Sequence, residues 1–353
     1  MVQDNTWFES SDGTKLYLRR WLSGPSPALR PVAVVHIVHG MAEHGERYGR
    51  LAEKLCGAGI EVWAADQRGH GKTADLSVND PGKGGLLGHC ADKGAWRRVT
   101  ADINSINREI RTIYPNIPLF LLGHSWGSFI VQNYIEEGGG EVADLPSVDL
   151  PSADLPSSDG DSAGFHLVNG CILSGTRGPG GLKVRVGKPF LTLLALVCGQ
   201  RRGSSIARAT ADGSHNRSFH PNRTFFDWLS RDEAEVDAYV DDPLCGSLCS
   251  AGFYRDLVRG LSQIHRPGAM ARIRRDMPIY IFSGSADPVG EMGASPTALV
   301  NAYRSLGIKN LEFVLYPGAR HETLNETNRD EVMNNLLSWI CRHTHSEQAA
   351  GKE

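Results

Sequence analysis

One short turn limits what this 353-residue chain can fold into more than any other segment. Residues 123–127 have the pattern Gly-X-Ser-X-Gly, and they stand directly between an apolar run at 119–122 and a helix-like stretch at 128–135. A strand, a sharp turn and a helix in this order hold a serine hydroxyl exposed, because the flanking glycines let neighbouring backbone pass close by. This context predicts a nucleophile, Ser125, rather than an ordinary turn. The other turn residues are Gly123, His124 and Gly127.

Apolar runs alternate with helix-like stretches along most of the chain. We expect strands at residues 15–21, 32–38, 61–65, 119–122, 167–173, 279–282 and 311–315, and helices at 48–58, 94–114, 128–135, 296–306 and 329–343. Strands that are apolar throughout favour burial on both faces, and alternation with helices favours parallel pairing. The pattern therefore predicts the α/β class, with a mostly parallel sheet that carries helices on both faces.

The composition is that of a globular protein long enough to bury a sizeable core, with 41% hydrophobic and 22% charged residues. A net charge of -3 gives no reason to expect a nucleic-acid partner. The seven cysteines are scattered and odd in number, which favours reduced thiols in the cytosol. The first residues lack the basic and apolar regions of a signal peptide, and no apolar run reaches the roughly 18–20 residues of a membrane span. We therefore expect a cytoplasmic protein.

Two segments interrupt the alternation. Residues 138–164 contain the sequence Asp-Leu-Pro-Ser three times in tandem, and so many prolines with so few apolar groups predict a disordered surface insert. Residues 177–267 have little strand character, and their apolar stretch at 190–197 has basic flanks. We expect a core of residues 1–176 and 268–345, an intervening helical lid of residues 177–267, and a disordered tail of residues 346–353.

Two interpretations of the apolar stretch at 190–197 stay open. It forms either a buried core helix with solvated flanks, or a lid whose apolar face covers an acyl chain and whose basic rim meets phosphate groups or anionic lipid. Its position after a sheet strand favours the lid, because ligand sites lie at the carboxyl ends of strands. The candidate lid residues for the substrate pocket are Phe190, Leu193 and Leu194.

A nucleophilic serine needs a base, and the base needs an acid that orients it. His321 follows the strand predicted at 311–315 and a short turn, which is the loop position that a general base requires. Asp287 follows the strand predicted at 279–282, so its carboxylate should accept a hydrogen bond from Nδ1–H of His321. Other candidates are less well placed. His215, His220 and His265 stand in the predicted lid, and His343 and His345 stand in the C-terminal tail. Asp276 precedes the strand predicted at 279–282, and Glu291 lies a helical turn too far beyond it.

Two backbone amides should stabilise the oxyanion that forms when serine attacks a carbonyl. The first is the amide of Trp126, at the N-terminus of the helix that follows the serine. The second should come from the loop after the strand predicted at 32–38, and we assign it to Met41. The same loop contributes His39 and Gly40 as candidates for the pocket.

Two other motifs predict structure rather than ligand binding. His36, His39 and His44 do not share the i, i+4 face of a helical zinc motif, so we expect no metal and no other cofactor. Residues 66–73 end in Gly-Lys-Thr like a phosphate-binding loop. Asp66 stands where such a loop needs its first glycine, so the segment is a structural turn.

Five blocks appear in an order that is specific when they are taken together. They are H-G-x-x-E-H at 39–44, D-x-R-G-H-G at 66–71, G-H-S-x-G at 123–127, S-G-x-x-D at 283–287 and G-x-x-H-E at 318–322. With these blocks the chain resembles the monoacylglycerol lipase and lysophospholipase branch of the α/β-hydrolases, which is sometimes grouped with the serine aminopeptidases. The likeness covers about residues 6–343, apart from the insert.

The resemblance implies a sheet of about eight strands with a helical lid after the sixth. It carries the nucleophile, acid and base onto Ser125, Asp287 and His321, and the oxyanion amides onto Met41 and Trp126. The last two side chains are bulkier than those often found in the family, which bears on the size of the substrate.

The sequence thus predicts a serine hydrolase that cleaves the carboxylic ester of a single-chain lipid through an acyl-enzyme. Monoacylglycerol and lysophospholipid both fit, and the basic residues of the lid favour a phosphate-bearing substrate and transient contact with the inner membrane face. A short-chain carboxylesterase, a thioesterase and an aminopeptidase are alternatives on the same fold. Epoxide and haloalkane hydrolysis are disfavoured, because those reactions place aspartate where Ser125 stands. A non-catalytic binding protein is the alternative of another class.

Overall fold

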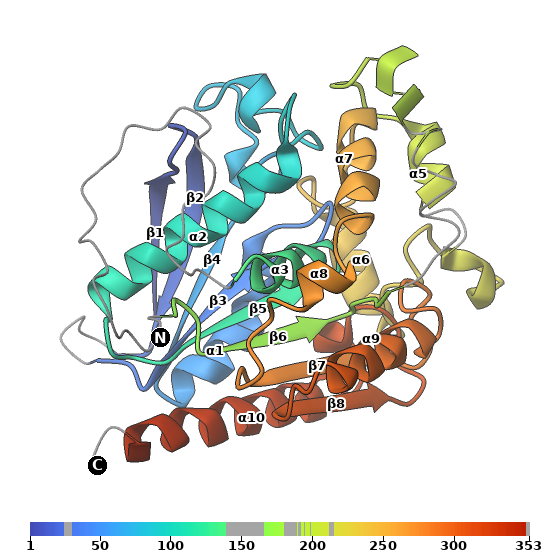
Figure 1. Ribbon diagram of the computed structural model, residues 1–353. Helices are drawn as coiled ribbons and strands as arrows, with labels where there is room; N and C mark the ends of the chain where they lie inside the picture. Colours follow the sequence, from blue (N-terminus) through green and yellow to red (C-terminus); the bar gives the residue numbers. More distant parts are fainter. Residues whose placement is uncertain are drawn as a thin grey trace.

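The computed structural model describes residues 1–24, 30–138, 166–179, 189, 192, 193, 195–197, 199–211 and 215–350. Its centre is one sheet in the order β1-β2-β4-β3-β5-β6-β7-β8, with helices on both sides (Figure 1). The strands are β1 (Val2–Glu9), β2 (Lys15–Leu22), β3 (Ala33–Val38), β4 (Ile60–Ala65), β5 (Leu119–His124), β6 (Gly170–Ser174), β7 (Ile279–Gly284) and β8 (Leu311–Tyr316). β2 runs antiparallel to β1 and β4, and all other neighbours are parallel. The predicted fold class is confirmed.

Each face of the sheet carries its own hydrophobic core. One core packs the strands against α2 (Ala95–Ile113), α3 (Trp126–Glu136) and α9 (Ala294–Ser305). The other packs them against α1 (Gly49–Gly57) and α10 (Arg329–Ala350). Because helices cover both faces, β3 to β7 are buried along their whole length, which explains their continuous apolar sequences.

Two ends of the chain differ from the prediction. β1 has no predicted counterpart, because its side chains are almost all exposed and it is held by backbone pairing with β2. The tail predicted from residue 346 is helical as far as Ala350, since α10 continues beyond Trp339 and Ile340, which are anchored in the core. Glutamate, glutamine and alanine then propagate a helix that already exists. The predicted insert at 138–164 lies outside the described residues, apart from residue 138.

The segment between β6 and β7 is helical in its described part. It contains α5 (Ser205–Ala211), the short turns η4 (His215–Phe219) and α8 (Pro267–Met270), and the longer helices α6 (Glu233–Asp241) and α7 (Ala251–Leu261). We call the described residues between 177 and 267 the cap. Figure 1 shows α5, α6 and α7 on the side of the sheet to which the arrowheads of the parallel strands point.

The described residues of the apolar stretch at 190–197 do not have the burial of the core helix that one interpretation predicted. Leu193, Leu196 and Val197 expose 60%, 75% and 75% of their surface, and Ala195 alone among its described residues is buried. Phe190 and Leu194 lie outside the described residues. No helix among the described residues combines the length and the apolar character that crossing a membrane requires.

Candidate active site

Ser125 lies in a strained turn between β5 and α3. Its backbone has φ 52° and ψ -121°, a conformation that is rare for any residue other than glycine. The two glycines of the motif are needed for close packing, because a Cβ on Gly123 would lie 2.7 Å from the carbonyl oxygen of Gly127. A Cβ on Gly127 would lie 2.1 Å from the carbonyl oxygen of Val38. The turn therefore has the strand-to-helix geometry that presents a serine hydroxyl.

The structure brings the predicted acid and base together. Nδ1 of His321, in the loop after β8, lies 3.0 Å from Oδ1 of Asp287, in the loop after β7. Asp287 is fully buried, and its carboxylate also accepts hydrogen bonds from the N–H of Val289 at 2.9 Å and from the hydroxyl of Ser283 at 3.2 Å. These bonds fix the carboxylate, and the carboxylate in turn fixes the imidazole ring.

The electrostatic environment sets the protonation states of Asp287 and His321. Burial by itself lowers the pKa of His321, but the carboxylate of Asp287 outweighs it, and the pKa is raised. Burial by itself raises the pKa of Asp287, but His321 and nearby backbone N–H groups outweigh it, so the pKa is lowered and the group stays ionised. Nε2 of His321 is buried and has no hydrogen-bond partner among the described residues. This nitrogen is free to accept a proton from a neighbour.

The loop that follows β3 runs directly against Ser125. A Cβ on Gly40 would lie 3.3 Å from Cβ of Ser125, which explains the glycine. Within the described part of the chain, the N–H groups of Met41 and Trp126 donate no hydrogen bond, so both remain available to a ligand. His39 does not line the pocket as predicted. Its Nδ1 bonds the carbonyl of Gly40 at 2.8 Å, and its Nε2 accepts from the N–H of Gln67 at 2.9 Å.

Ser125 and His321 line one pocket of about 480 Å³, part of it open to solvent. The sequence predicted Gly40 for the pocket, Met41 for the oxyanion hole and His124 for the serine turn, and all three line this pocket. It missed the residues that the cap contributes: Arg208, Phe226, Trp228, Leu229, Tyr239, Gly246, Ser247 and Tyr254. The bulky ring of Trp126 lies elsewhere, with its centroid 5.2 Å from that of His70 and 5.1 Å from that of Phe253.

The cap contacts His321 directly. The indole of Trp228 lies with its centroid 5.1 Å from that of the His321 ring. The backbone N–H of Glu322 donates to the carbonyl of Leu229 at 2.8 Å, and that of His321 to the carbonyl of Trp228 at 3.4 Å. The loop that carries His321 is therefore held by cap and core together.

Comparison with known proteins now identifies the chain. Residues 30–145 and 166–328 match the model of a family described as serine aminopeptidase, S33. The chain belongs to this family. A monoglyceride lipase of Mus musculus is 27% identical, over 99% of this chain and 93% of the relative. A monoacylglycerol lipase of Mycolicibacterium smegmatis is 26% identical, over 95% of this chain and 96% of the relative.

The solved structures agree with this assignment. A highly thermostable carboxyl esterase from Bacillus coagulans, solved in complex with glycerol, matches with a TM-score of 0.79 and 26% identity, covering 98% of this chain and 99% of the esterase. The predictions of an α/β-hydrolase of this family and of a carboxylic ester hydrolase are confirmed.

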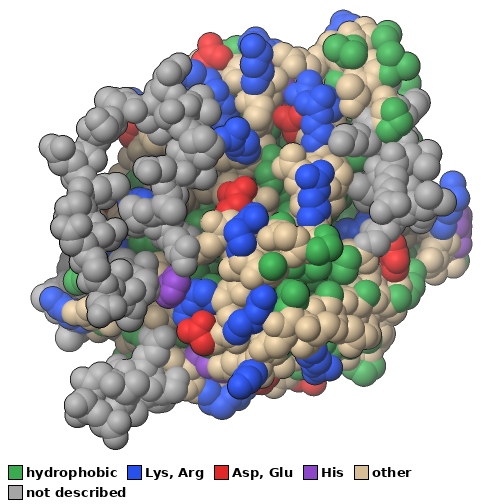
Figure 2. All heavy atoms as spheres, viewed as in Figure 1, with side chains coloured by type: hydrophobic (Ala, Val, Ile, Leu, Met, Phe, Trp, Pro, Cys, Tyr) green, Lys and Arg blue, Asp and Glu red, His purple; other side chains and the backbone are tan. Residues whose placement is uncertain are grey.

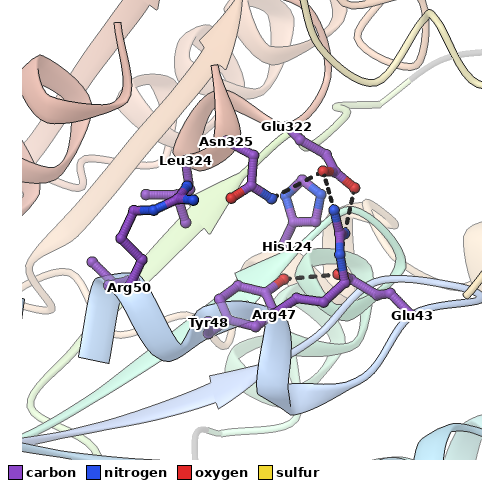
Figure 3. A pocket seen from close by; sticks show the side chains of 9 residues that line it. Glu43, Arg47, Tyr48, Arg50, His124, Glu322, Leu324 and Asn325 are labelled. Carbon is purple, nitrogen blue, oxygen red and sulfur yellow. Dashed lines mark hydrogen bonds and ion pairs between the residues drawn. The ribbon is translucent and has the colours of Figure 1, made fainter. Parts of the chain in front are cut away.

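A second, polar pocket of about 340 Å³ adjoins the first in this S33 family member, and Figure 3 shows the side chains that line it. Arg47 donates to Glu322 at 2.6 and 2.7 Å and to Glu43 at 2.8 Å, and the hydroxyl of Tyr48 donates to Glu43 at 3.0 Å. Glu43, His124 and Glu322 line both pockets. Burial raises the pKa of Glu43, but Arg47 outweighs this and lowers it to about 2.

Sequence reasoning did not single out this network, although its members stand inside the motifs. Glu43 belongs to the H-G-x-x-E-H block and Glu322 follows the predicted base. The i, i+4 spacing of Glu43 and Arg47 was the available signal. Two carboxylates share one guanidinium, so the network carries a net negative charge.

The S33 fold of this chain also contains a second array of serine, histidine and aspartate. His89 lies with Nδ1 2.8 Å from Oγ of Ser250 and with Nε2 3.1 Å from Oδ1 of Asp92. His89 and Ser250 are almost completely buried, and Ser250 accepts the N–H of Phe253 as the N-cap of α7. This array joins cap to core, since Ser250 N–H also donates to the carbonyl of Gly88.

Proposed function

We propose that this protein is a serine hydrolase that cleaves monoacylglycerols, with Ser125 as the nucleophile, His321 as the base and Asp287 as the residue that orients it. The observation that carries the proposal is that His321, which is hydrogen-bonded to Asp287, lines the same pocket as a serine on a strained turn. A serine hydroxyl needs such a base, because at neutral pH it is a weak nucleophile without one.

The reaction follows from the positions of these groups. Nε2 of His321 accepts the proton of the Ser125 hydroxyl as Oγ attacks the ester carbonyl, and the N–H groups of Met41 and Trp126 donate to the oxyanion. His321 then gives its proton to the leaving alcohol as the C–O bond breaks. Water repeats the two steps on the acyl-enzyme, releasing the fatty acid and restoring Ser125.

The charge of the polar pocket favours a neutral alcohol over a phosphate ester. The carboxylates of Glu43 and Glu322 and the guanidinium groups of Arg47 and Arg50 line this pocket. Arg47 is paired with both of these carboxylates, and Arg50 is paired with Glu235 at 2.7 Å. A phosphate would meet two carboxylates and two guanidinium groups that already have carboxylate partners, whereas glycerol hydroxyls both donate to carboxylates and accept from a guanidinium. The acyl chain would lie against the apolar cap wall, which includes Phe226 and Leu229. The names of the two relatives, both lipases of monoacylglycerols, support this choice.

One observation favours lysophospholipid as a second candidate. Arg208 of α5 lines the pocket that contains Ser125, and its guanidinium lies over the rings of Phe225 and Phe226 at 4.5 and 5.1 Å. A cation at this wall would attract a phosphate headgroup. Arg208 is thus the cation of the first pocket that a phosphate-bearing substrate would contact.

We further propose that the cap contacts a lipid surface to load its substrate. Leu193, Leu196, Val197 and Ile206 are exposed on the cap. Figure 2 shows hydrophobic side chains at the upper right, over the α5 region, and Lys and Arg side chains along α7 beside them. An apolar group with a basic rim matches the interface of an anionic membrane.

The deciding experiment compares fatty acid release from 1-acylglycerol, lysophosphatidylcholine, a short p-nitrophenyl ester and an aminoacyl amide. We expect the highest kcat/KM for the 1-acylglycerol. We also expect a fluorophosphonate probe to label the wild type and not Ser125→Ala, whose kcat should fall by at least about 10⁴-fold. Folded wild-type protein that neither labels nor hydrolyses any of these substrates would overturn the proposal.

A further inference from the structure

The cap holds the loop that carries Met41. The carbonyl oxygen of Ala42, the next residue, accepts the hydroxyl of Tyr239 at 2.8 Å and the backbone N–H of Gly246 at 2.9 Å. A carbonyl has two lone pairs, so the cap uses both of them. Tyr239 is buried, and burial raises the pKa of its phenol well above the usual range. The hydroxyl therefore keeps the proton that it donates.

The backbone that these bonds hold is strained. Ala42 has a φ of 56°, in the left-handed region that residues with a Cβ avoid. Such a conformation persists only where the surroundings determine it. On the other side of Met41, the N–H of Gly40 donates to Glu43, so the core fixes that end of the loop. The carbonyl of Gly40, in the same peptide as the Met41 N–H, is also bonded by Nδ1 of His39 at 2.8 Å. This peptide thus lies between two contacts from the core and two from the cap.

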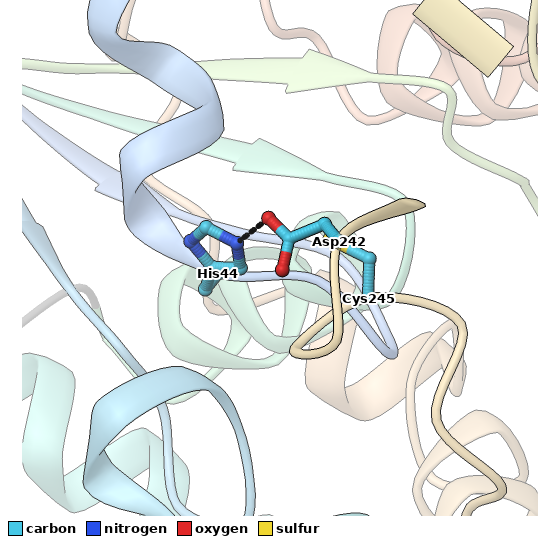
Figure 4. Close-up of side chains that lie close together, drawn as sticks. All are labelled: His44, Asp242 and Cys245. Atoms are coloured by element: carbon cyan, nitrogen blue, oxygen red, sulfur yellow. Dashed lines mark hydrogen bonds and ion pairs between the residues drawn. The ribbon is translucent and has the colours of Figure 1, made fainter. Parts of the chain in front are cut away.

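Further contacts join the same two segments. Nε2 of His44 lies 2.8 Å from Oδ2 of Asp242, and Figure 4 shows these side chains with Cys245 beside them. The guanidinium of Arg47 lies 4.8 Å from the centroid of the Tyr239 ring. Residues 239–246 of the cap therefore hold residues 42–47 of the core at several points, and only the bonds to Ala42 act on backbone next to Met41.

We propose that Tyr239 is a positioning residue for the oxyanion hole, because its hydroxyl holds Ala42 in the conformation that directs the Met41 N–H toward the substrate carbonyl. This inference rests on the proposed function and deepens it. It makes docking of the cap and completion of the oxyanion hole a single event. An enzyme whose cap is displaced would bind an ester and hydrolyse it slowly.

The test is Tyr239→Phe, which removes the hydroxyl and keeps the ring. Tyr303→Phe is the matched control, because the Tyr303 hydroxyl is equally buried and bonds nothing among the described residues. For Tyr239→Phe we expect kcat to fall about tenfold with KM within about twofold, a smaller loss than removal of an oxyanion donor causes. Affinity for an alkyl boronic acid, which forms a tetrahedral adduct with serine, should fall by the same factor. The assays contain a chelator, because His44, Asp242 and Cys245 place ligand atoms within 4.8 Å of one another and could bind a cation.

A second readout does not need activity. Hydrogen exchange in a peptide that covers residues 39–45 should be faster in Tyr239→Phe than in the wild type and unchanged in Tyr303→Phe. Unchanged exchange, or faster exchange with an unchanged kcat, would overturn the role of Tyr239 and leave the proposed function intact. A wild type that lacks both labelling by fluorophosphonate and esterase activity would instead overturn the proposed function, and the positioning role with it.

Discussion

The imidazole rings of His124 and His321 lie side by side, with 4.9 Å between their centroids. Two protonated imidazoles at this distance would repel each other. Burial, followed by the effect of His321, lowers the pKa of His124 to about 4, whereas the pKa of His321 is raised. One ring therefore stays neutral while the other takes up a proton, which is consistent with the proposed role of His321 as the base.

This difference predicts the acid limb of the pH profile. His321 must be neutral to accept a proton, so kcat/KM should fall as the pH drops through a pKa above the ordinary 6.5 of histidine. Asp287→Asn removes the carboxylate that raises this pKa. It should move the limb to lower pH and reduce kcat by about 10⁴-fold. The measurement is kcat/KM against pH for a soluble ester.

His124→Gln is the control for this profile. It removes the neighbouring ring and leaves the bond between His321 and Asp287, so the limb should stay above 6.5. A limb that does not move in Asp287→Asn would show that another group controls the titration.

Arg47 provides a second prediction, on stability. Its guanidinium is buried between Glu43 and Glu322, which expose only 4% and 6% of their side chains. Arg47→Leu would leave two buried carboxylates without a cation, and the free energy of unfolding should fall by about 3–5 kcal/mol. Urea denaturation at pH 7 measures the change.

The control is Arg50→Leu, because Arg50 pairs with Glu235 at 2.7 Å but is 46% exposed. An exposed pair contributes at most about 1 kcal/mol, so this variant should remain close to the wild type. Equal losses in the two variants would mean that the buried network contributes no more to the free energy of unfolding than an exposed ion pair does.

The alternation of apolar runs with helix-like stretches was enough to predict the parallel part of the sheet, and the order of the motifs was enough to predict that Asp287 and His321 lie together. Buried parallel strands have continuous apolar sequences, and the residues that follow β5, β7 and β8 come together at one edge of the sheet. This is why His321 and Asp287 could be predicted from their positions after strands.

The remaining features depend on contacts between distant segments. β1 has side chains that are almost all exposed and is defined by its pairing with β2, so no alternation of buried and exposed positions within residues 2–9 predicts it. Tyr239 reaches Ala42 across 197 positions of the chain, and helical periodicity does not indicate such a contact. His39 was predicted to line the pocket because it stands in a motif near the site. It does not line the pocket, since both of its ring nitrogens bond backbone groups.

The exposed cap residues give a third prediction. Leu196→Glu should weaken binding to vesicles of mixed neutral and anionic lipid by about tenfold or more, because it replaces a side chain whose burial contributes roughly 1.5–3 kcal/mol. Ile113→Glu is the matched control, since Ile113 is 38% exposed at the end of α2, far from α5 in Figure 1. Co-sedimentation with vesicles measures binding. Equal binding by the wild type and Leu196→Glu would exclude this part of the cap as the contact.

The last prediction concerns stability in acid, and it rests on the buried neutral histidines. Burial is the largest cause that lowers the pKa of His36, His70, His124 and His265, to about 4, 3, 4 and 4. In the unfolded chain these groups titrate near 6.5, so between about pH 6.5 and 4 the unfolded state binds more protons. The free energy of unfolding should therefore fall as the pH drops through this window. Each histidine contributes up to about 1.4 kcal/mol per pH unit.

His321 has the opposite sign, since its raised pKa adds stability that is complete below 6.5 and is lost as the pH rises through the folded value. His36→Gln isolates one acid-sensitive group, because glutamine can still donate to Oδ1 of Asn107, which His36 now bonds at 2.7 Å. The slope of its unfolding free energy against pH should be smaller than that of the wild type, because about one proton fewer is taken up on unfolding. His220→Gln, which replaces an exposed histidine, should keep the slope of the wild type. Urea denaturation at several pH values decides the matter, and identical slopes in all three proteins would contradict a neutral, buried His36.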